Sequence, residues 1–350
     1  MMVKKNTTFN PRSSVWMRPF MIALLISTIA SLSQADYRDR EEVQLFIDEL
    51  IDTENVDRAW LEQMFSDAEY SQSVIDAISR PAEKTLTWAE YQKIFLTQSR
   101  LDRGVEFWRE NASVLEEAET EFGVPPEIIL AIIGVETLYG RFTGGYRVID
   151  ALSTLAFDYP PRASFFRGEL KSLVKLASQH QVDPASLTGS YAGAMGLGQF
   201  IPSSYLAYSA DYDGDGFADL WENPSDAIWS VANYLARHGW SRDKPIFTPV
   251  SLPENFPENL LNQNLRPYTN IGELQALGVI GLPTSADFGE PEEVTLMGLT
   301  GLGGSEYWIG QHNFYVITRY NHSHLYGMAV SHLAHRLGVA SVELELEDID

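Results

Sequence analysis

The chain contains no cysteine among its 350 residues. Disulfide bonds, thiolate catalysis, cysteine-bound zinc and a lipid-modified N-terminal cysteine are therefore excluded. Because 45% of the residues are hydrophobic, the burial of apolar surface must supply the stability that disulfides give to small exported proteins. A chain of this length predicts one large domain or two to three small ones.

Basic residues are also few. The chain has 25 lysines and arginines against 48 aspartates and glutamates, and its formal net charge is −23. Proteins that bind nucleic acids present a basic face to the phosphates, so this charge balance argues against a nucleic-acid partner. The charge affects solubility rather than fold, and adaptation to saline or acidic surroundings is left open as its cause.

Residues 1–35 have the features of a secretory signal peptide. Four basic residues precede the apolar run FMIALLISTIASL, and Ser33-Gln34-Ala35 supplies small residues after it. The run is shorter than the roughly 20 residues that a membrane-spanning helix needs. We expect cleavage after Ala35, which takes the formal charge from −23 to −27. Export without disulfides favours the periplasm, and an uncleaved membrane anchor is the alternative.

The hydrophobic periodicity predicts a mainly α fold (α+β) in several parts. From Asp36 to about residue 100, apolar residues recur at three- and four-residue spacing, which predicts a lobe of short helices. Residues 101–242 would form the core. They begin with one helix over 101–122, which ends at Gly123 and is followed by two prolines that suit the first turn of the next helix.

The composition changes between residues 243 and 304, where proline, glycine and asparagine are frequent. This composition predicts a small β-containing insertion. Residues 305–350 would complete the core, with NFYVITRY as a buried strand and SHLYGMAVSHLAHRLG as a final amphipathic helix. The acidic end, VELELEDID, is expected to be a solvated tail.

The apolar stretch IILAIIGVETLYG, residues 128–140, contains a single acid, Glu136. On a helix this acid shares a stripe with Ile129, Ile132 and Ile133, so it would point toward the core. Burial and the negative end of the helix dipole both favour the neutral carboxyl, so we expect its pKa to be raised. A protonated acid can donate to a leaving oxygen, as glycosidic cleavage requires. A buried structural glutamate is the alternative.

The stretch TGSYAGAMGLGQFIPSSY, residues 188–205, contains four glycines, which allow a ligand to approach the backbone closely. A phosphate loop is excluded because no Gly-Lys-Ser/Thr follows. Ser190 and Gln199 could bond to a sugar, and the rings of Tyr191 and Phe200 could stack on it. A tight turn with an apolar plug is the alternative.

The stretch DYDGDGFADLWE, residues 211–222, matches the twelve-residue calcium loop of an EF-hand. Clustered carboxylates repel one another without a cation, and calcium prefers hard oxygen ligands of this kind. An acidic turn without an ion is the alternative. The template predicts ligands from Asp211, Asp213, Asp215, the Phe217 carbonyl, Asp219 and Glu222. The short segment before the loop argues for a structural clip.

Four motifs in this order, IIGVETLYG, GSYAGAMGLGQF, the aspartate loop and ITRYNHS, resemble the membrane-bound lytic transglycosylase B family, which cleaves bacterial cell-wall peptidoglycan. The similarity covers nearly all of the chain after the signal. It implies a lysozyme-like core with an N-terminal helical lobe and a small β insertion. Because this chain has no cysteine to acylate, it departs from lipid-anchored members, and a periplasmic form without a lipid anchor is expected.

The resemblance also implies the site residues and partners. It makes Glu136 the catalytic residue, glycan strands of peptidoglycan the substrate and other cell-wall enzymes further candidate partners. The complete twelve-position loop makes Ca²⁺ the expected structural cofactor. The substrate-binding residues that it implies are Arg162, Ser190, Met195, Gln199, Phe200, Tyr320, Asn321 and Tyr326.

As the resemblance implies it, Glu136 protonates the oxygen between N-acetylmuramic acid and N-acetylglucosamine. It then removes a proton from the muramoyl 6-hydroxyl, which attacks C1 and leaves a 1,6-anhydromuramoyl end. A glycosidase that adds water normally uses two carboxyl groups, and the matched motifs supply one. A hydrolytic muramidase and a non-catalytic calcium-dependent wall-binding protein are the alternatives.

Overall fold

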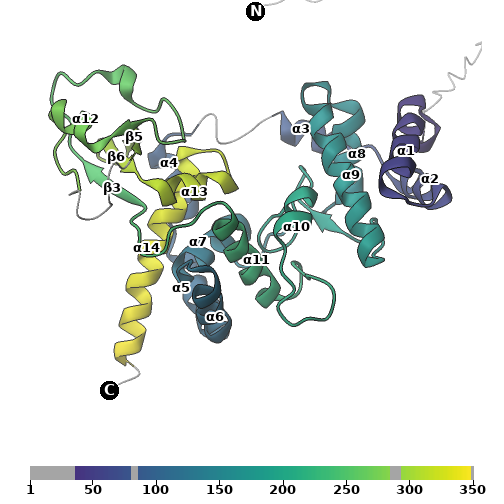
Figure 1. Ribbon diagram of the computed structural model, residues 1–350, viewed down its shortest axis with the longest axis horizontal. Coiled ribbons are helices and arrows are strands. Elements are labelled where there is room, and N and C mark those ends of the chain that lie inside the picture. Colours follow the sequence, from purple (N-terminus) through teal and green to yellow (C-terminus); the bar gives the residue numbers. More distant parts are fainter. Residues whose placement is uncertain (1–35, 80–85, 284–292, 348–350) are drawn as a thin grey trace, which may run out of the picture. The chain divides into compact units, whose positions relative to one another are not determined.

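The computed structural model describes residues 36–79, 86–283 and 293–347, and the predicted signal segment lies outside them. The described chain is mainly helical, with small antiparallel sheets (Figure 1). The predicted fold class is therefore confirmed. The helices are η1 (Tyr37–Asp39), α1 (Glu41–Glu54), α2 (Arg58–Asp67), α3 (Gln72–Ile78), α4 (Trp88–Phe95), α5 (Gln98–Glu110), α6 (Ala112–Phe122), α7 (Pro126–Thr137), α8 (Val148–Asp158), η3 (Pro160–Arg162), α9 (Ala163–His180), α10 (Pro202–Tyr208), α11 (Pro224–Arg237), η4 (Glu258–Leu260), α12 (Ile271–Ala276), α13 (His312–Tyr320) and α14 (His324–Glu347).

The central element is α7, which is surrounded by α5, α6, α11 and α14. Pro126 occupies its first turn, where the missing N–H is harmless, and ten of its twelve residues are buried. A helix that is apolar all round is enclosed on all sides rather than packed along one stripe. The side chains of α7 that retain some exposure are those of Glu127 and Glu136.

The predicted N-terminal helices do not all share the same neighbours. α1 and α2 contact η1, and α3 contacts α8, whereas α4 contacts β5 (Glu293–Gly301) and α14. Edge-to-face contacts join Phe46 and Phe65 to Phe157 of α8, with ring centroids 5.9 and 6.2 Å from it. The division of the chain into the predicted domains stays a prediction.

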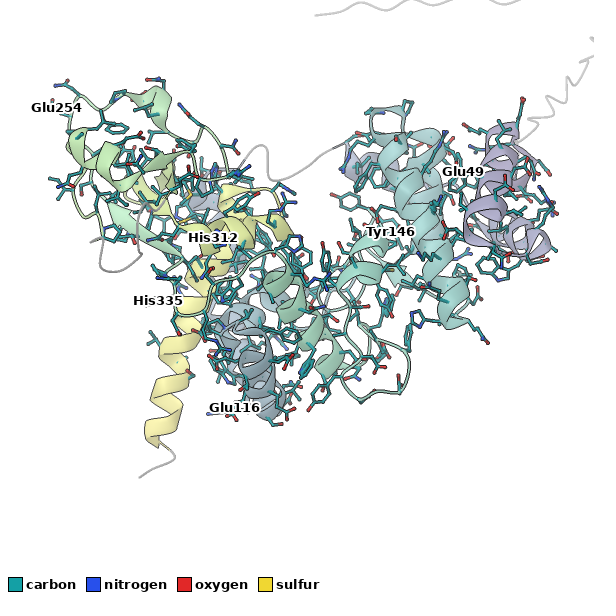
Figure 2. All side chains as sticks on the ribbon, in the orientation of Figure 1. Glu49, Glu116, Tyr146, Glu254, His312 and His335 are labelled. Carbon is teal, nitrogen blue, oxygen red and sulfur yellow. The ribbon has the colours of Figure 1, made fainter. Side chains whose placement is uncertain are left out.

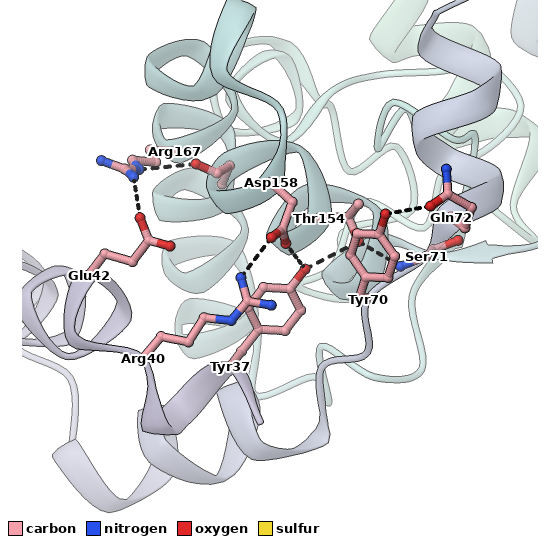
Figure 3. A network of polar contacts seen from close by, with 10 residues as sticks. Tyr37, Arg40, Glu42, Tyr70, Ser71, Gln72, Thr154, Asp158 and Arg167 are labelled. Carbon is pink, nitrogen blue, oxygen red and sulfur yellow. Dashed lines mark hydrogen bonds and ion pairs between the residues drawn. The ribbon is translucent and has the colours of Figure 1, made fainter. Parts of the chain in front are cut away.

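A polar network ties the first helices to α8 and α9 (Figure 3). The Tyr37 hydroxyl donates to Asp158 Oδ2 at 2.6 Å, and Arg40 Nη1 donates to Asp158 Oδ1 at 2.9 Å. The backbone N–H of Ser71 donates to the Thr154 hydroxyl at 3.0 Å. Burial, and then the hydrogen bond to Asp158, raise the pKa of Tyr37, so this phenol stays a neutral donor.

The sheet of the insertion is antiparallel, with strand order β3-β6-β5-β4. Its strands are β3 (Phe247–Val250), β4 (Thr269–Asn270), β5 (Glu293–Gly301) and β6 (Gly304–Gly310), and a separate pair joins β1 (Tyr146–Arg147) to β2 (Thr188–Gly189). β5 is buried on both faces. Val294 and Leu296 belong to the insertion's own apolar cluster, while Met297 and Leu299 belong to the main core. The insertion is therefore packed onto the helices through β5.

Two local predictions were wrong. The predicted helix over 101–122 is two helices, because the chain breaks at Asn111, whose side-chain amide bonds to the Phe107 carbonyl at 2.8 Å. The predicted strand NFYVITRY lies in helix α13, where Phe314 and Ile317 are buried at helical spacing. The acidic end, predicted as a solvated tail, is helical as far as Glu347, and its solvation stays a prediction.

The surplus of acidic residues is carried at the surface. Glu49 of α1, Glu116 of α6 and Glu254 of the loop after β3 are exposed (Figure 2). Solvation of these carboxylates keeps their mutual repulsion small at physiological ionic strength. The net charge therefore leaves the apolar core undisturbed.

We predict that Asp158→Ala lowers the free energy of unfolding by about 1–3 kcal/mol, because it leaves the buried Tyr37 hydroxyl only the longer contact of 3.4 Å with the Thr154 hydroxyl. Urea unfolding followed by circular dichroism measures the change. The control is Asp48→Ala, which breaks an exposed ion pair with Arg58 and should cost about 0–1 kcal/mol. Equal losses in the two variants would contradict the role given to the network.

Candidate active site

Glu136 lies near the C-terminal end of α7, where the enclosed helix reaches solvent, and its side chain is partly exposed. The Tyr326 hydroxyl donates a hydrogen bond to Glu136 Oε1 at 2.8 Å. Tyr326 lies in the first turn of α14 and is 1% exposed. A carboxyl group with one oxygen held by a phenol and some access to solvent has a fixed orientation and can reach a ligand.

A second phenol lies beside the first. The ring of Tyr320, the last residue of α13, is nearly parallel to that of Tyr326, with centroids 6.4 Å apart. Its hydroxyl donates to the Gly198 carbonyl of the glycine-rich loop. Burial, and then the negative charge of Glu136, raise the pKa of both tyrosines well above the usual range. Both phenols therefore remain neutral donors throughout the physiological pH range.

The glycine-rich loop keeps its shape through its own backbone. Met195 and Phe200 exchange two backbone hydrogen bonds of 2.9 Å, and the Ser190 hydroxyl accepts from the N–H groups of Ala192 and Ala194. Gly196 has φ +68°, and a Cβ there would lie 2.3 Å from the Leu220 carbonyl oxygen. This position therefore needs glycine.

Gln199 closes the loop onto the segment that follows α7. Its φ is +51°, and its side-chain amide donates to the carbonyls of Thr143 and Gly196 at 3.0 Å. Beyond the loop, the buried carboxylate of Glu169 accepts from the backbone and hydroxyl of Ser203 and so caps the start of α10. The C-terminal part of the loop is therefore held by two other segments of the chain.

The predicted substrate residues other than Tyr320 and Tyr326, which are described above, divide into three groups. Ser190, Gln199 and Asn321 are partly exposed, whereas Met195 and Phe200 are buried and support the loop from beneath. Arg162 lies on η3 and stacks its guanidinium 4.4 Å above the Phe165 ring. The contacts described above bring Glu136, Tyr326, Tyr320 and the loop together and do not include Arg162. The roles of all these residues in substrate binding stay predictions.

The aspartate loop contains a possible cation site. Single carboxylate oxygens of Asp211, Asp213 and Asp226 all lie within 4.8 Å of one another. Asp226 is fully buried in the first turn of α11, and its oxygens accept from the N–H groups of Tyr212 and Asp219. Burial raises the pKa of Asp226, and the nearby charges of Asp213 and Asp211 raise it further. Three converging carboxylates are the kind of donor set that a divalent cation satisfies.

Sequence analysis did not find Asp226, because the twelve-position template ends at Glu222, which is exposed. Asp219 uses Oδ1 to accept from the N–H groups of Trp221 and Glu222, at 3.0 Å each. The sequence signal that could have indicated Asp226 is Asn223-Pro224, which starts a helix directly after the loop and places Asp226 in its first turn. The helix before the loop, α10, is short, as predicted, and the helix after it, α11, is longer.

Comparison with known proteins identifies the family. The model of the Transglycosylase SLT domain matches residues 38–335. Membrane-bound lytic murein transglycosylase B of Escherichia coli (strain K12) is 40% identical over 317 residues, which cover 88% of this chain and 86% of that protein. The chain belongs to the lytic murein transglycosylase B family. It is an enzyme that acts as a lytic transglycosylase on peptidoglycan, so the non-catalytic alternative is wrong.

Solved structures agree with this assignment. Catenated lytic transglycosylase SltB1 of Pseudomonas aeruginosa has a TM-score of 0.83 and 48% identity, over 87% of this chain and 99% of that one. Lytic transglycosylase Slt35 of E. coli in complex with calcium has a TM-score of 0.79 and 40% identity, over 88% of this chain and 96% of that one. SltB3 of P. aeruginosa in complex with NAG-anhNAM-pentapeptide has a TM-score of 0.75 and 30% identity, over 85% and 78%.

Within the described part of the enzyme, we find no helix both long and apolar enough to cross a membrane. The predicted signal segment, residues 1–35, lies outside the described residues.

We predict that Tyr326→Phe in this transglycosylase lowers kcat by about tenfold or more with little change in KM. The variant keeps the ring in its buried site but removes the hydrogen bond to Glu136, so we expect turnover to change rather than glycan binding. Steady-state turnover of soluble glycan strands measures both constants. The control is Tyr268→Phe in the insertion, whose hydroxyl bonds to backbone carbonyls there. An unchanged kcat for Tyr326→Phe would refute this role.

Proposed function

We propose that the enzyme cleaves the β-1,4 bond between N-acetylmuramic acid and N-acetylglucosamine with Glu136 as its single acid and base. The observation that supports this most directly is the position of Glu136. It is held by the Tyr326 phenol at the end of an otherwise enclosed apolar helix and is partly open to solvent. A general acid begins the reaction in its protonated form.

In the first step, the protonated Glu136 gives its proton to the glycosidic oxygen. The bond from C1 to that oxygen breaks, N-acetylglucosamine leaves with a free 4-hydroxyl, and positive charge develops at C1. The negative carboxylate that remains stabilises this charge. The neutral Tyr326 hydroxyl, still donating to Oε1, favours that carboxylate.

In the second step, the Glu136 carboxylate removes the proton from the muramoyl 6-hydroxyl as that oxygen bonds to C1. The 1,6-anhydro ring closes and Glu136 is protonated again, so no water is consumed. Because nucleophile and electrophile belong to one sugar, the reaction gains from proximity. Among the predicted catalytic and substrate-binding residues Glu136 is the only acid, and this route needs one carboxyl group. The relative SltB3, solved with NAG-anhNAM-pentapeptide, supports an anhydro product.

The residues of the loop would position the glycan. Ser190, Gln199 and Asn321 are partly exposed and polar, and we assign them hydrogen bonds to sugar hydroxyl or acetamido groups. Arg162 and the ring of Phe165 would add a more distant contact, since both are exposed and stacked on each other. Met195, Phe200, Tyr320 and Tyr326 would act from beneath by fixing the loop and the acid.

We predict that Glu136→Gln abolishes release of anhydromuramoyl products, with a loss of turnover of at least about 10³-fold. Mass spectrometry of digested peptidoglycan distinguishes anhydro ends from reducing ends, which are heavier by one water. Glu127→Gln, at the other end of α7, is the matched control and should remain active. Reducing ends from the wild type would instead support the hydrolytic muramidase.

The cell location follows from substrate and sequence. Peptidoglycan lies outside the inner membrane, and residues 1–35 have the composition of an export signal. We therefore place the enzyme in the periplasm, exported by a cleaved signal and without a lipid anchor.

We propose that the aspartate loop binds Ca²⁺ as a structural ion. The related Slt35 was solved in complex with calcium. In this chain Asp211, Asp213 and Asp226 bring carboxylate oxygens together, and Asp215 and the Phe217 carbonyl lie on the same loop. A bound divalent cation would offset the repulsion among these carboxylates and fix the turn between α10 and α11.

We predict that Ca²⁺ raises the melting temperature of the wild type and that Asp226→Asn removes most of this increase. Differential scanning calorimetry with calcium and with a chelator measures the effect, since an ion that binds only the folded state stabilises it. The matched control is Glu222→Gln, which should keep the increase because Glu222 is outside the carboxylate cluster. If Glu222→Gln lost the increase and Asp226→Asn kept it, the ligands predicted from the twelve-position loop would be supported instead.

A further inference from the structure

The chain directly after Glu136 adopts an uncommon backbone conformation. Leu138, Tyr139 and Gly140 follow one another with φ values of +53°, +58° and +81°. Residues other than glycine are strained in this left-handed region because of their Cβ atom. Within the described residues, Leu138 and Tyr139 are the one pair of adjacent non-glycine residues with positive φ. Such a turn persists only when its surroundings impose it.

The ring of Tyr139 fills a slot between two helices. A Cβ on Gly104 of α5 would lie 2.4 Å from the Tyr139 hydroxyl oxygen, and a Cβ on Gly134 of α7 would lie 2.5 Å from it. Phe107 contributes a ring whose centroid is 5.5 Å away. Glycine at both positions is therefore what allows Tyr139 to fit in the slot.

Arg100 of α5 holds the same end of α7 from another direction. Its Nε donates to the Gly134 carbonyl at 2.9 Å, and its Nη1 donates to the Ile94 carbonyl at 2.5 Å. The Gly134 carbonyl also accepts from the N–H of Leu138 at 3.1 Å. A cation at the C-terminal end of a helix satisfies free carbonyls and interacts favourably with the helix dipole.

The residue between Glu136 and the strained turn is fixed as well. The Thr137 hydroxyl donates to the Leu197 carbonyl of the glycine-rich loop at 2.9 Å and accepts from the N–H of Gly140 at 3.0 Å. The backbone is therefore held two residues before Glu136, at the next residue and three residues after it.

We propose that Arg100 and Tyr139 are positioning residues, which fix the end of α7 so that the Glu136 carboxyl meets both Tyr326 and the substrate. The inference depends on the proposed role of Glu136. A displacement of about 1 Å at a reacting group can cost about 10²-fold in rate, so support of this kind affects turnover more than binding.

The ring rather than the hydroxyl would supply this support. The Tyr139 hydroxyl is buried and has no hydrogen-bond partner within the described residues. Burial raises its pKa, so it stays neutral. Tyr139→Phe removes an unsatisfied polar group and keeps the ring, and this conservative variant should retain most of the activity. Tyr139→Ala empties the slot, and its kcat should fall about ten- to a hundredfold with KM within about twofold.

The test compares kcat and KM on soluble glycan strands for Tyr139→Ala, Tyr139→Phe and Arg100→Gln, below the unfolding temperature of each. Leu61→Ala, at a buried site of α2, controls for loss of stability alone. The inference predicts a low kcat for Tyr139→Ala and Arg100→Gln and recovery in Tyr139→Phe. If Tyr139→Ala does not fold, Arg100→Gln decides the matter. If the kcat values of Tyr139→Ala and Arg100→Gln are no lower than that of Leu61→Ala, the inference is overturned.

A second comparison uses the slot itself. Gly104→Ala should lower kcat because its Cβ meets both the Tyr139 hydroxyl oxygen and Cδ2 of Leu337, and adding Tyr139→Phe should recover the part of the loss that the hydroxyl causes. If the double variant recovered none of the lost kcat, the fit of Tyr139 between Gly104 and Gly134 would not be what supports turnover. Glu136→Gln, measured alongside, separates the two hypotheses. If it stays active, the proposed function fails, whereas if it is inactive while Tyr139→Ala and Arg100→Gln are unimpaired, only the positioning role fails.

Discussion

The enzyme depends on one helix that is enclosed by protein and yet ends at solvent. Ten of the twelve residues of α7 are buried, and α5, α6, α11 and α14 surround it. Enclosure makes the helix rigid, because a packed interior leaves little room for displacement. A carboxyl group at the end of such a helix needs no large motion to be in place, and a site built on a rigid element holds its geometry better than one built on a loop.

The elements around Glu136 have complementary roles. α13 and α14 supply two stacked tyrosines that remain neutral because they are buried beside a negative charge. The glycine-rich loop reaches the same place through the bond from Tyr320 to the Gly198 carbonyl, and Gln199 fastens it to the segment after α7. These segments are far apart in the chain, and hydrogen bonds rather than sequence proximity bring them together.

The aspartate loop lies directly between α10 and α11, and the Leu197 N–H of the glycine-rich loop bonds to the Leu220 carbonyl at 2.7 Å. A cation held by the aspartate loop would therefore stabilise the glycine-rich loop through this bond. The Tyr205 hydroxyl, bonded to the Ala218 carbonyl at 2.9 Å, adds a second connection of the same kind. This arrangement supports the reading of the metal loop as a structural clip.

The sequence by itself determined the family, the predominance of helix, the α7 start at Pro126 and the unusual acid within an apolar helix, because all of these depend on local residue type and spacing. It did not determine the neighbours of each element. NFYVITRY is apolar enough for a strand or a helix, and only packing against α14 and β6 decided in favour of α13. Likewise, Asp226 and Arg100 carry no motif, and the motif that contains Tyr139 does not show what its ring contacts. Their roles exist only because the fold brings Asp226 beside Asp211, Tyr139 between two glycines and Arg100 to the end of α7, and such long-range contacts cannot be read from local sequence.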